Sequence, residues 1–411
     1  MIAVTVEEAL RLWNEALQEQ HHSIESVAVG DAKGCVLVED VLAPTDVPAF
    51  HKSAMDGYAL AYEAGRDDYI VDGIIGAGVV WDKPVTTGHA VRIMTGAPVP
   101  DTCDTVIMQE QVQGTGEIGS TITIQGHQQK GSHIIPRGEE CLAGTVVIPK
   151  GTEITSTVQT ILTGLGCTDV SVYVMPRILV LTSGHEVIEP GEPLTAGKIY
   201  NSNRMMICSL LDDLGFRHIT HYHVSDAPDK LDSEIKRVLE LAEQADIIIS
   251  SGGVSVGMFD TMPLIYEKLG AKTLYDRIQM RPGAASYGAV TPKGQLIFGL
   301  SGNPGAAFNG WHLLVVPTLR RYKGLINWST PVLNCVMDCD LSKRNAFDRY
   351  VQGKVIFGDG QPRFVANRHF NSSSMLGLYT VNALACIPQG VHEVHEGDTF
   401  NVYLLGLLPA I

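Results

Sequence analysis

The chain has 411 residues, of which 45% are hydrophobic and 18% are charged, and its formal net charge is −15. This length exceeds one ordinary hydrophobic core, so several compact domains are expected, and the composition is globular, without the run of about 20 apolar residues that spans a membrane. The negative charge argues against nucleic acid and anionic lipid as general partners.

The first predicted element is an amphipathic helix near the start of the chain. Thr5 is its expected N-cap, Glu8 completes a capping box, and Leu10, Trp13 and Leu17 lie on one face. The segment lacks the basic region of a signal peptide, and the eight cysteines are scattered without a CxxC pair. We therefore expect a cytoplasmic protein with reduced thiols.

The rest of the chain changes character twice. Residues 69–150 hold short strand-like segments between Gly, Pro and Asp, which predict a β-rich module, and a helical passage follows at 155–167. From 177 to 322 strands alternate with helices, which predicts a mostly parallel sheet covered on both faces. Residues 331–411 return to short strands and indicate a small all-β unit.

Three loops rich in small residues follow strands of the predicted α/β sheet, at 182–186, 250–257 and 299–304. Glycine lets backbone N–H groups approach an anion, and a following helix adds its positive end. Each loop alone could be a tight turn. Because the carboxyl ends of parallel strands meet at one edge, the three together predict a crevice for an anionic ligand.

Acidic and histidine side chains provide candidate metal ligands. Carboxylates are hard oxygen ligands of the kind that Mg²⁺ prefers, although most acids are simply solvated. His221 and His223 lie on one face of a predicted strand, where they could bind a transition metal or be satisfied structural histidines. The acidic candidates are Asp56, Glu139, Glu140, Glu186, Asp226 and Asp260.

Six segments in this order resemble the molybdopterin molybdenumtransferases, the family of bacterial MoeA and the E domain of gephyrin. They are PTDVPAFHKSAMDGYAL (44–60), RIMTGAPVP (92–100), PRGEE (136–140), IYNSNR (199–204), SSGGVSVG (250–257) and GLSGNP (299–304).

The resemblance implies a multidomain α/β plus β architecture and a homodimer in which the β-rich domain of one subunit closes over the α/β domain of the other. The expected parts are a split N-terminal helical domain (1–46 and 142–172), an inserted β-rich domain (47–141), a molybdopterin-binding α/β domain with a parallel sheet (173–325) and a small C-terminal β domain (326–411).

The implied reaction takes adenylylated molybdopterin and molybdate, inserts molybdenum at the dithiolene and releases AMP with the help of Mg²⁺. Matching position by position assigns catalytic roles to Asp56, Thr95, Glu186 and Arg281. The implied metal ligands are Glu140, Asp226 and Asp260. The implied substrate-binding residues are Gly252, Gly253, Ser255, Ser301, Gly302, Asn303 and Pro304.

The sequence departs from the family pattern at the pocket. The usual TGDE reads SGHE with His185, GED reads GEE at Glu140, and PGNP reads SGNP with Ser301. Of two lysines in the usual KPGKP, one is Arg281 and the other is lost at Ala284. Arginine keeps the charge with different geometry, whereas alanine donates nothing to an anion.

These departures leave two further interpretations beside the enzyme. One is a catalytically degenerate paralogue that binds the pterin as a carrier or regulator, and the other is a scaffold that binds a protein partner. The retained acids favour the enzyme, whereas Ala284 and His185 favour binding without turnover. Molybdate and tungstate are not distinguished as metal donors.

Overall fold

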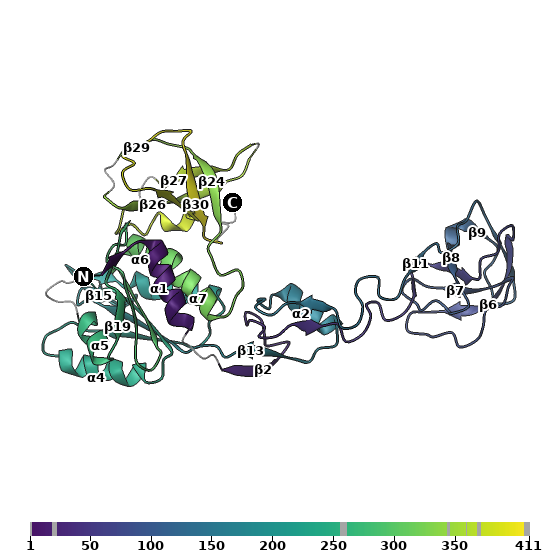
Figure 1. The fold of residues 1–411 in the computed structure, drawn as a ribbon, viewed down its shortest axis with the longest axis horizontal. Helices are drawn as coiled ribbons and strands as arrows, with labels where there is room; N and C mark the ends of the chain where they lie inside the picture. Colours follow the sequence, from purple (N-terminus) through teal and green to yellow (C-terminus); the bar gives the residue numbers. More distant parts are fainter. Residues whose placement is uncertain are drawn as a thin grey trace. The chain divides into compact units, whose positions relative to one another are not determined.

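A computed structural model describes residues 2–18, 23–254, 261–342, 346–358, 360–367 and 371–406. The chain forms two compact units (Figure 1). The first comprises Met1–Val38, Gly151–Gln159 and Asp169–Ile411, and the second comprises Glu39–Lys150 and Thr160–Thr168. In the part of the chain that the structure describes, no helix is both long and apolar enough to cross a membrane.

The first unit is built on a six-stranded sheet in the order β17-β14-β18-β23-β22-β19. Four neighbouring strands are parallel, as the alternation of strands and helices predicts: β17 (Ile219–Val224), β14 (Ile178–Ser183), β18 (Ile247–Ser251) and β23 (Leu296–Leu300). Two antiparallel strands that the sequence did not reveal extend the sheet, β22 (Tyr287–Val290) and β19 (Lys272–Tyr275). Each has four residues, too few to show a period.

Helices cover both faces of this sheet (Figure 1). Alternate residues of each strand point to opposite faces, so Val180 and Ile249 join one core while Leu181 and Ile248 join the other. The first core also contains residues of α1 (Val6–Gln18), α3 (Ser202–Asp213), α6 (Pro304–Gly310) and α7 (Val316–Tyr322). The second contains residues of α4 (Leu231–Ala242) and α5 (Met262–Lys268).

Helix α1 belongs to this unit through its buried face. Trp13 is fully buried, stacks on Phe298 at 4.4 Å between ring centroids, and donates its indole N–H to the Tyr275 hydroxyl at 3.0 Å. Truncating such a residue costs about 3–5 kcal/mol. The Thr5 hydroxyl accepts from the Glu8 N–H at 3.1 Å, as predicted, but the Glu8 carboxylate pairs with Arg11. The reciprocal half of the predicted capping box is therefore wrong.

The last helical segment of the α/β part, residues 304–322, is not a regular α-helix throughout. A π-helical segment, Trp311–Val315, separates α6 from α7. Pro317 lies just beyond it and has no N–H to donate to the preceding turn. A π-helical turn accommodates the missing hydrogen bond without ending the helix, so residues 304–322 form one continuous helical segment.

The C-terminal strands close into a small barrel. The order is β26-β27-β24-β30-β28, and β28 pairs back with β26. The short strand β21 (Met280–Arg281) joins this barrel from the α/β segment by parallel pairing with β26. The strands are β24 (Val332–Met337), β26 (Asp348–Ile356), β27 (Arg363–Ala366), β28 (Ala383–Ile387) and β30 (Thr399–Leu404). The predicted small β domain is confirmed.

The second unit contains a six-stranded sheet in the order β8-β5-β7-β6-β10-β9, as expected for a β-rich module. Hydrophobic clusters around Val91 and Ile107 form its core. The strands are β5 (Gly57–Leu60), β6 (Asp68–Ile75), β7 (His89–Ile93), β8 (Thr105–Met108), β9 (Val112–Gln113) and β10 (Thr121–Ile124).

Short elements complete the described residues. Six two-stranded pairs are β1 (Ala3–Val4) with β20 (Arg277–Ile278), β2 (Ile24–Ala28) with β13 (Asp169–Tyr173), β3 (Val41–Leu42) with β12 (Val146–Ile148), β4 (Lys52–Ser53) with β11 (Ile134–Ile135), β15 (Val187–Ile188) with β16 (Ile199–Tyr200), and β25 (Leu341–Ser342) with β29 (Glu393–Val394). The predicted helix near 155–167 is α2 (Ser156–Gly164), and 3-10 turns lie at Gln109–Gln111 and Leu378–Thr380.

Candidate functional site

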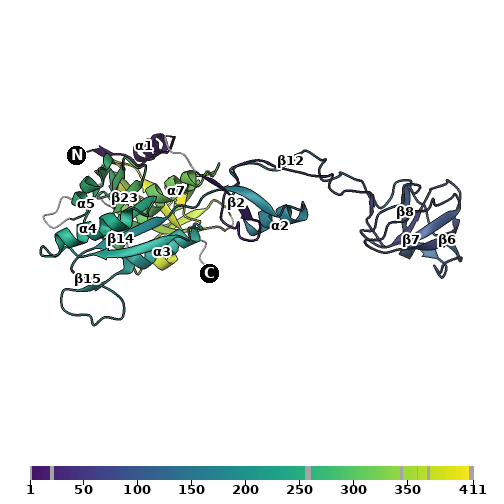
Figure 2. The same ribbon diagram turned by 90° about the horizontal axis from the view of Figure 1, so that it is seen from below.

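A cavity of about 630 Å³ lies in the first unit at the carboxyl ends of β14, β18 and β23. The loop next to β15 projects from this unit (Figure 2). The lining residues are 182–187, 199–203, Asp226, 251–254, Ala285 and 301–304. The structure therefore brings the three predicted loops to one crevice, at the sheet edge where ligands bind in folds of this kind.

Two glycines of the second loop are required by their surroundings. Gly252 and Gly253 have φ of +89° and +60°, and a Cβ on either would lie 2.7 Å from an oxygen of Ser183. A Cβ on Gly302 would lie 3.3 Å from the Gly252 Cα. The three loops thus touch through bare backbone. The Gly252 N–H already donates to the Leu300 carbonyl at 3.2 Å, so an anion would be bound by other N–H groups of these loops.

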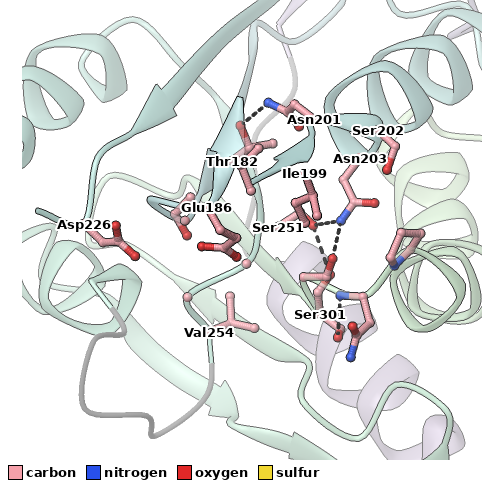
Figure 3. A pocket seen from close by; sticks show the side chains of 18 of the residues that line it. Thr182, Glu186, Ile199, Asn201, Ser202, Asn203, Asp226, Ser251, Val254 and Ser301 are labelled. Atoms are coloured by element: carbon pink, nitrogen blue, oxygen red, sulfur yellow. Dashed lines mark hydrogen bonds between the residues drawn. The ribbon is translucent and has the colours of Figure 1, made fainter. Parts of the chain in front are cut away.

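Polar side chains tie the loops together on the side shown at the right of Figure 3. The Asn203 amide donates to the Ser251 hydroxyl and to the Gly302 carbonyl, both at 2.8 Å. The Ser251 hydroxyl in turn donates to the Ser301 carbonyl at 3.0 Å. Asn203 and Ser251 were not among the predicted site residues, although both lie in segments that carried the resemblance.

The opposite side of the pocket is acidic (Figure 3). Glu186 and Asp226, predicted from different loops, come together there with His185. His185 Nδ1 lies 3.8 Å from Glu186 Oε2 and 3.6 Å from Asp226 Oδ1. The Asp226 side chain is 12% exposed, and its Oδ1 has no hydrogen-bond partner among the described residues. Gly184, with φ +132°, leaves room for the Glu186 carboxylate to fold back over it.

The side chains of His221 and His223 both contact the hydroxyl of Thr182. His221 Nε2 and His223 Nδ1 lie 3.0 and 3.1 Å from Thr182 Oγ1, which also accepts from the Asn201 amide at 3.0 Å. A hydroxyl accepts two hydrogen bonds and donates one, so these three partners satisfy it. Burial and the Arg204 guanidinium lower the pKa of His221 to about 4. The arrangement favours structural histidines over a metal pair.

Glu189 orients Asn201 and Arg204 through hydrogen bonds. It accepts from the Asn201 amide at 2.9 Å and from Arg204 at 2.6 Å. Burial alone would raise the pKa of Glu189, but these two donors hold it below its ordinary value. Asn201 also caps α3, accepting from the Arg204 N–H at 3.2 Å. A charged carboxylate therefore orients the amide that contacts Thr182 in the pocket wall.

Asp56 and Thr95 also form a pair, within the second unit. Asp56 Oδ1 accepts from the Thr95 N–H at 2.7 Å and from its hydroxyl at 2.8 Å, and both residues are exposed. These two bonds lower the pKa of Asp56. Gly57 after it is required, because a Cβ there would lie 1.9 Å from the Ile107 carbonyl oxygen. The two residues were assigned to the same β-rich module, and their catalytic roles stay predictions.

Four other predicted site residues are not among the lining residues that the structure describes. Arg281 is exposed on β21, and among the described lining residues its segment contributes Ala285 instead. Glu140 is exposed in the second unit. Ser255 and Asp260 lie outside the described residues. The roles of these four stay predictions.

Comparison with known proteins covers nearly the whole chain. Residues 4–166 match the MoeA N-terminal region (domain I and II), residues 179–321 match a probable molybdopterin binding domain, and residues 334–405 match the MoeA C-terminal region (domain IV). The chain is 35% identical over 402 residues to a molybdopterin molybdenumtransferase of Staphylococcus aureus (strain MSSA476), covering 95% of this chain and 94% of that protein.

Two further similarities agree with this match. A molybdopterin molybdenumtransferase of Bacillus subtilis (strain 168) is 36% identical over 392 residues, which are 93% of this chain and 90% of that protein. The crystal structure of a molybdopterin biosynthesis MoeA protein from Pyrococcus horikoshii OT3 superimposes with a TM-score of 0.79 at 26% identity, covering 98% of this chain and 100% of the other.

Proposed function

The chain belongs to the molybdopterin molybdenumtransferase family, and from this premise we propose that it inserts molybdenum from molybdate into adenylylated molybdopterin and releases AMP. It is a transferase of molybdenum cofactor biosynthesis. The adenylylated form of the substrate, molybdate as donor and AMP as product are the proposed details. The observation that carries them is one pocket that combines glycine backbone with the carboxylates of Glu186 and Asp226.

The glycine loops would bind the phosphate groups of the substrate. No lysine or arginine stands among the described lining residues, so the donors available to an oxyanion are backbone N–H groups, hydroxyl and amide side chains, and His185. Preorganised N–H groups in a crevice stabilise anionic charge without reorganising. The network of Asn203, Ser251 and Ser301 would keep the loops in register while the ligand binds.

The acidic side of the pocket fits the divalent cation that this chemistry requires. Asp226 Oδ1 is buried without a hydrogen-bond partner among the described residues, and a bound cation would satisfy it. Glu186 and Asp226 would hold the ion, with Glu140 and Asp260 as further predicted ligands. When bound, such an ion neutralises phosphate charge and polarises phosphoryl oxygens.

A homodimer and a cytoplasmic location are part of the same proposal. The resemblance implies that the β-rich domain of one subunit, with Asp56 and Thr95, serves the pocket of its partner. Light scattering should give roughly twice the chain mass of 44.4 kDa, and a fully active monomer would contradict this assembly. The eight cysteines are all free, which fits a reducing compartment.

The direct experiment measures AMP. The protein is incubated with adenylylated molybdopterin and Mg²⁺, with and without molybdate, and released AMP is separated and quantified. Molybdate-dependent AMP release supports the transferase. A stable pterin complex that releases no AMP at any molybdate or tungstate concentration would support the degenerate binding protein instead.

A further inference from the structure

His185 places an imidazole nitrogen where it can share an ion with two carboxylates. One ligand atom from each of His185, Glu186 and Asp226 lies within 4.8 Å of the other two. The His185 side chain is 75% exposed, so it can rotate toward an ion without disturbing the core. Asp226 is the anchor of the group, because its side chain is only 12% exposed.

The spacing of the three ligand atoms is compatible with one shared ion. Two ligands about 2.1 Å from a tetrahedral ion are roughly 3.4 Å apart, and adjacent ligands of octahedral Mg²⁺ are about 3 Å apart. The observed separations from His185 Nδ1 are 3.6 and 3.8 Å. Small side-chain movements would bring the three atoms onto one ion, so the preference between ions depends on the ligand types.

One feature indicates that the site lacks a partner that a cation would supply. The Asp226 Oδ1 atom is buried and lacks a hydrogen-bond partner among the described residues, a situation that costs free energy unless a ligand satisfies it. The Glu186 carboxylate folds back over Gly184, whose lack of a Cβ leaves room for it beside the other two ligand atoms.

We propose that His185 is a metal ligand and that His185, Glu186 and Asp226 form a three-ligand site that selects Zn²⁺ over Mg²⁺. The proposal rests on the proposed function and names the cation of the same pocket. Imidazole nitrogen suits Zn²⁺, whereas Mg²⁺ is bound through oxygen. Three protein ligands with the remaining position open to the pocket is the arrangement of a zinc site that also contacts substrate.

The test measures metal binding directly, without substrate. The full-length protein is freed of metal with a chelator and titrated with ZnCl₂ and with MgCl₂ by calorimetry. We expect one Zn²⁺ per chain. We expect His185→Asp, which restores an all-oxygen set, to weaken Zn²⁺ binding by at least about 10–100-fold, the cost of altering a residue that only supports a metal ligand, and to strengthen Mg²⁺ binding.

Controls separate this ligand from other sites. His218→Gln changes an exposed histidine outside the lining residues and should leave Zn²⁺ binding unchanged. Asp226→Asn should weaken Zn²⁺ binding like His185→Asp. Thermal unfolding of each metal-free variant checks folding. Co²⁺ substituted for Zn²⁺ should absorb visible light more strongly than aqueous Co²⁺, and this intensity should fall in His185→Asp.

If His185→Asp bound Zn²⁺ with a Kd within twofold of that of the parent protein, the proposal would be overturned. It would also be overturned if the parent protein bound Mg²⁺ more tightly than Zn²⁺. These outcomes do not depend on turnover. If His185 proves irrelevant to Zn²⁺ while molybdate-dependent AMP release persists, the ligand assignment fails and the transferase stands. If Zn²⁺ binding depends on His185 but no AMP appears, the metal site stands and the proposed reaction fails.

Discussion

Replacing Gly252 with alanine should disturb both the stability of its loop and the pocket that the loop lines. Its φ of +89° costs an L-amino acid about 1–2 kcal/mol. The added Cβ would also lie 2.7 Å from the Ser183 carbonyl oxygen and 3.2 Å from its hydroxyl. A backbone oxygen cannot swing away as a side chain can, so the loop itself must move, and overpacking of this kind adds about 1–3 kcal/mol.

Gly294→Ala is the matched control. Gly294 has φ +84°, nearly the same conformational cost, but a Cβ there would meet no atom within 4 Å. It lies in the turn before β23, at the other end of that strand from the pocket. Both variants should therefore lose about 1–2 kcal/mol of unfolding free energy from backbone conformation, and only Gly252→Ala should carry the additional cost of displacing the loop.

The assays are urea unfolding for stability and calorimetry with AMP for the pocket. We expect the Kd for AMP to rise at least about tenfold in Gly252→Ala, which corresponds to 1.4 kcal/mol of lost binding, and to stay unchanged in Gly294→Ala. If Gly252→Ala bound AMP as tightly as the parent protein, the glycine loop would not be the phosphate cradle.

Three further predictions concern the reacting groups and pH. Asp56→Asn and Glu186→Gln should each lower AMP-release turnover about 10²–10³-fold while leaving the urea midpoint near that of the parent protein; near-normal turnover in either would remove that residue from the mechanism. Ala284→Lys should raise molybdate-dependent AMP release or lower the molybdate concentration required, since it restores a cation beside the pocket residue Ala285. An unchanged molybdate dependence would show that the reaction does not need a cation at position 284. Burial lowers the pKa of His312 to about 3, so folding stability present above about pH 6.5 is lost as pH falls toward that value. The urea midpoint of His312→Leu should consequently fall less between pH 7 and pH 5 than that of the parent protein, and equal slopes would contradict this assignment.

The strands were predictable where their burial requires a run of apolar residues in the sequence. Strands β14, β18 and β23 are buried along their whole length, and each begins with at least three consecutive apolar residues. The sequence of strand β22 shows no such run, because its four residues include Gly288. This glycine packs against the Tyr275 ring and contributes no hydrophobic side chain. Short antiparallel additions to a parallel sheet are set by tertiary pairing, which local sequence does not encode.

The pocket was predictable from its backbone more than from its side chains. Glycines that follow strands indicated the crevice, since positive φ and close packing demand them. Asn203 was missed because an Asn in the first turn of a helix is equally typical of local capping. Its contact with Gly302 joins residues 99 positions apart, and only the folded chain brings them together.

The burial of Trp13 determines when helix α1 can dock during synthesis of the chain. Its hydrogen-bond partner Tyr275 leaves the ribosome 262 residues later, a delay of roughly 10–50 s at about 5–20 residues per second. Until then α1 lacks the strand β19 and the helix α7 that it contacts. Exposed apolar surface makes an incomplete chain prone to aggregation, so the docking of α1 has to wait until the α/β domain is nearly complete.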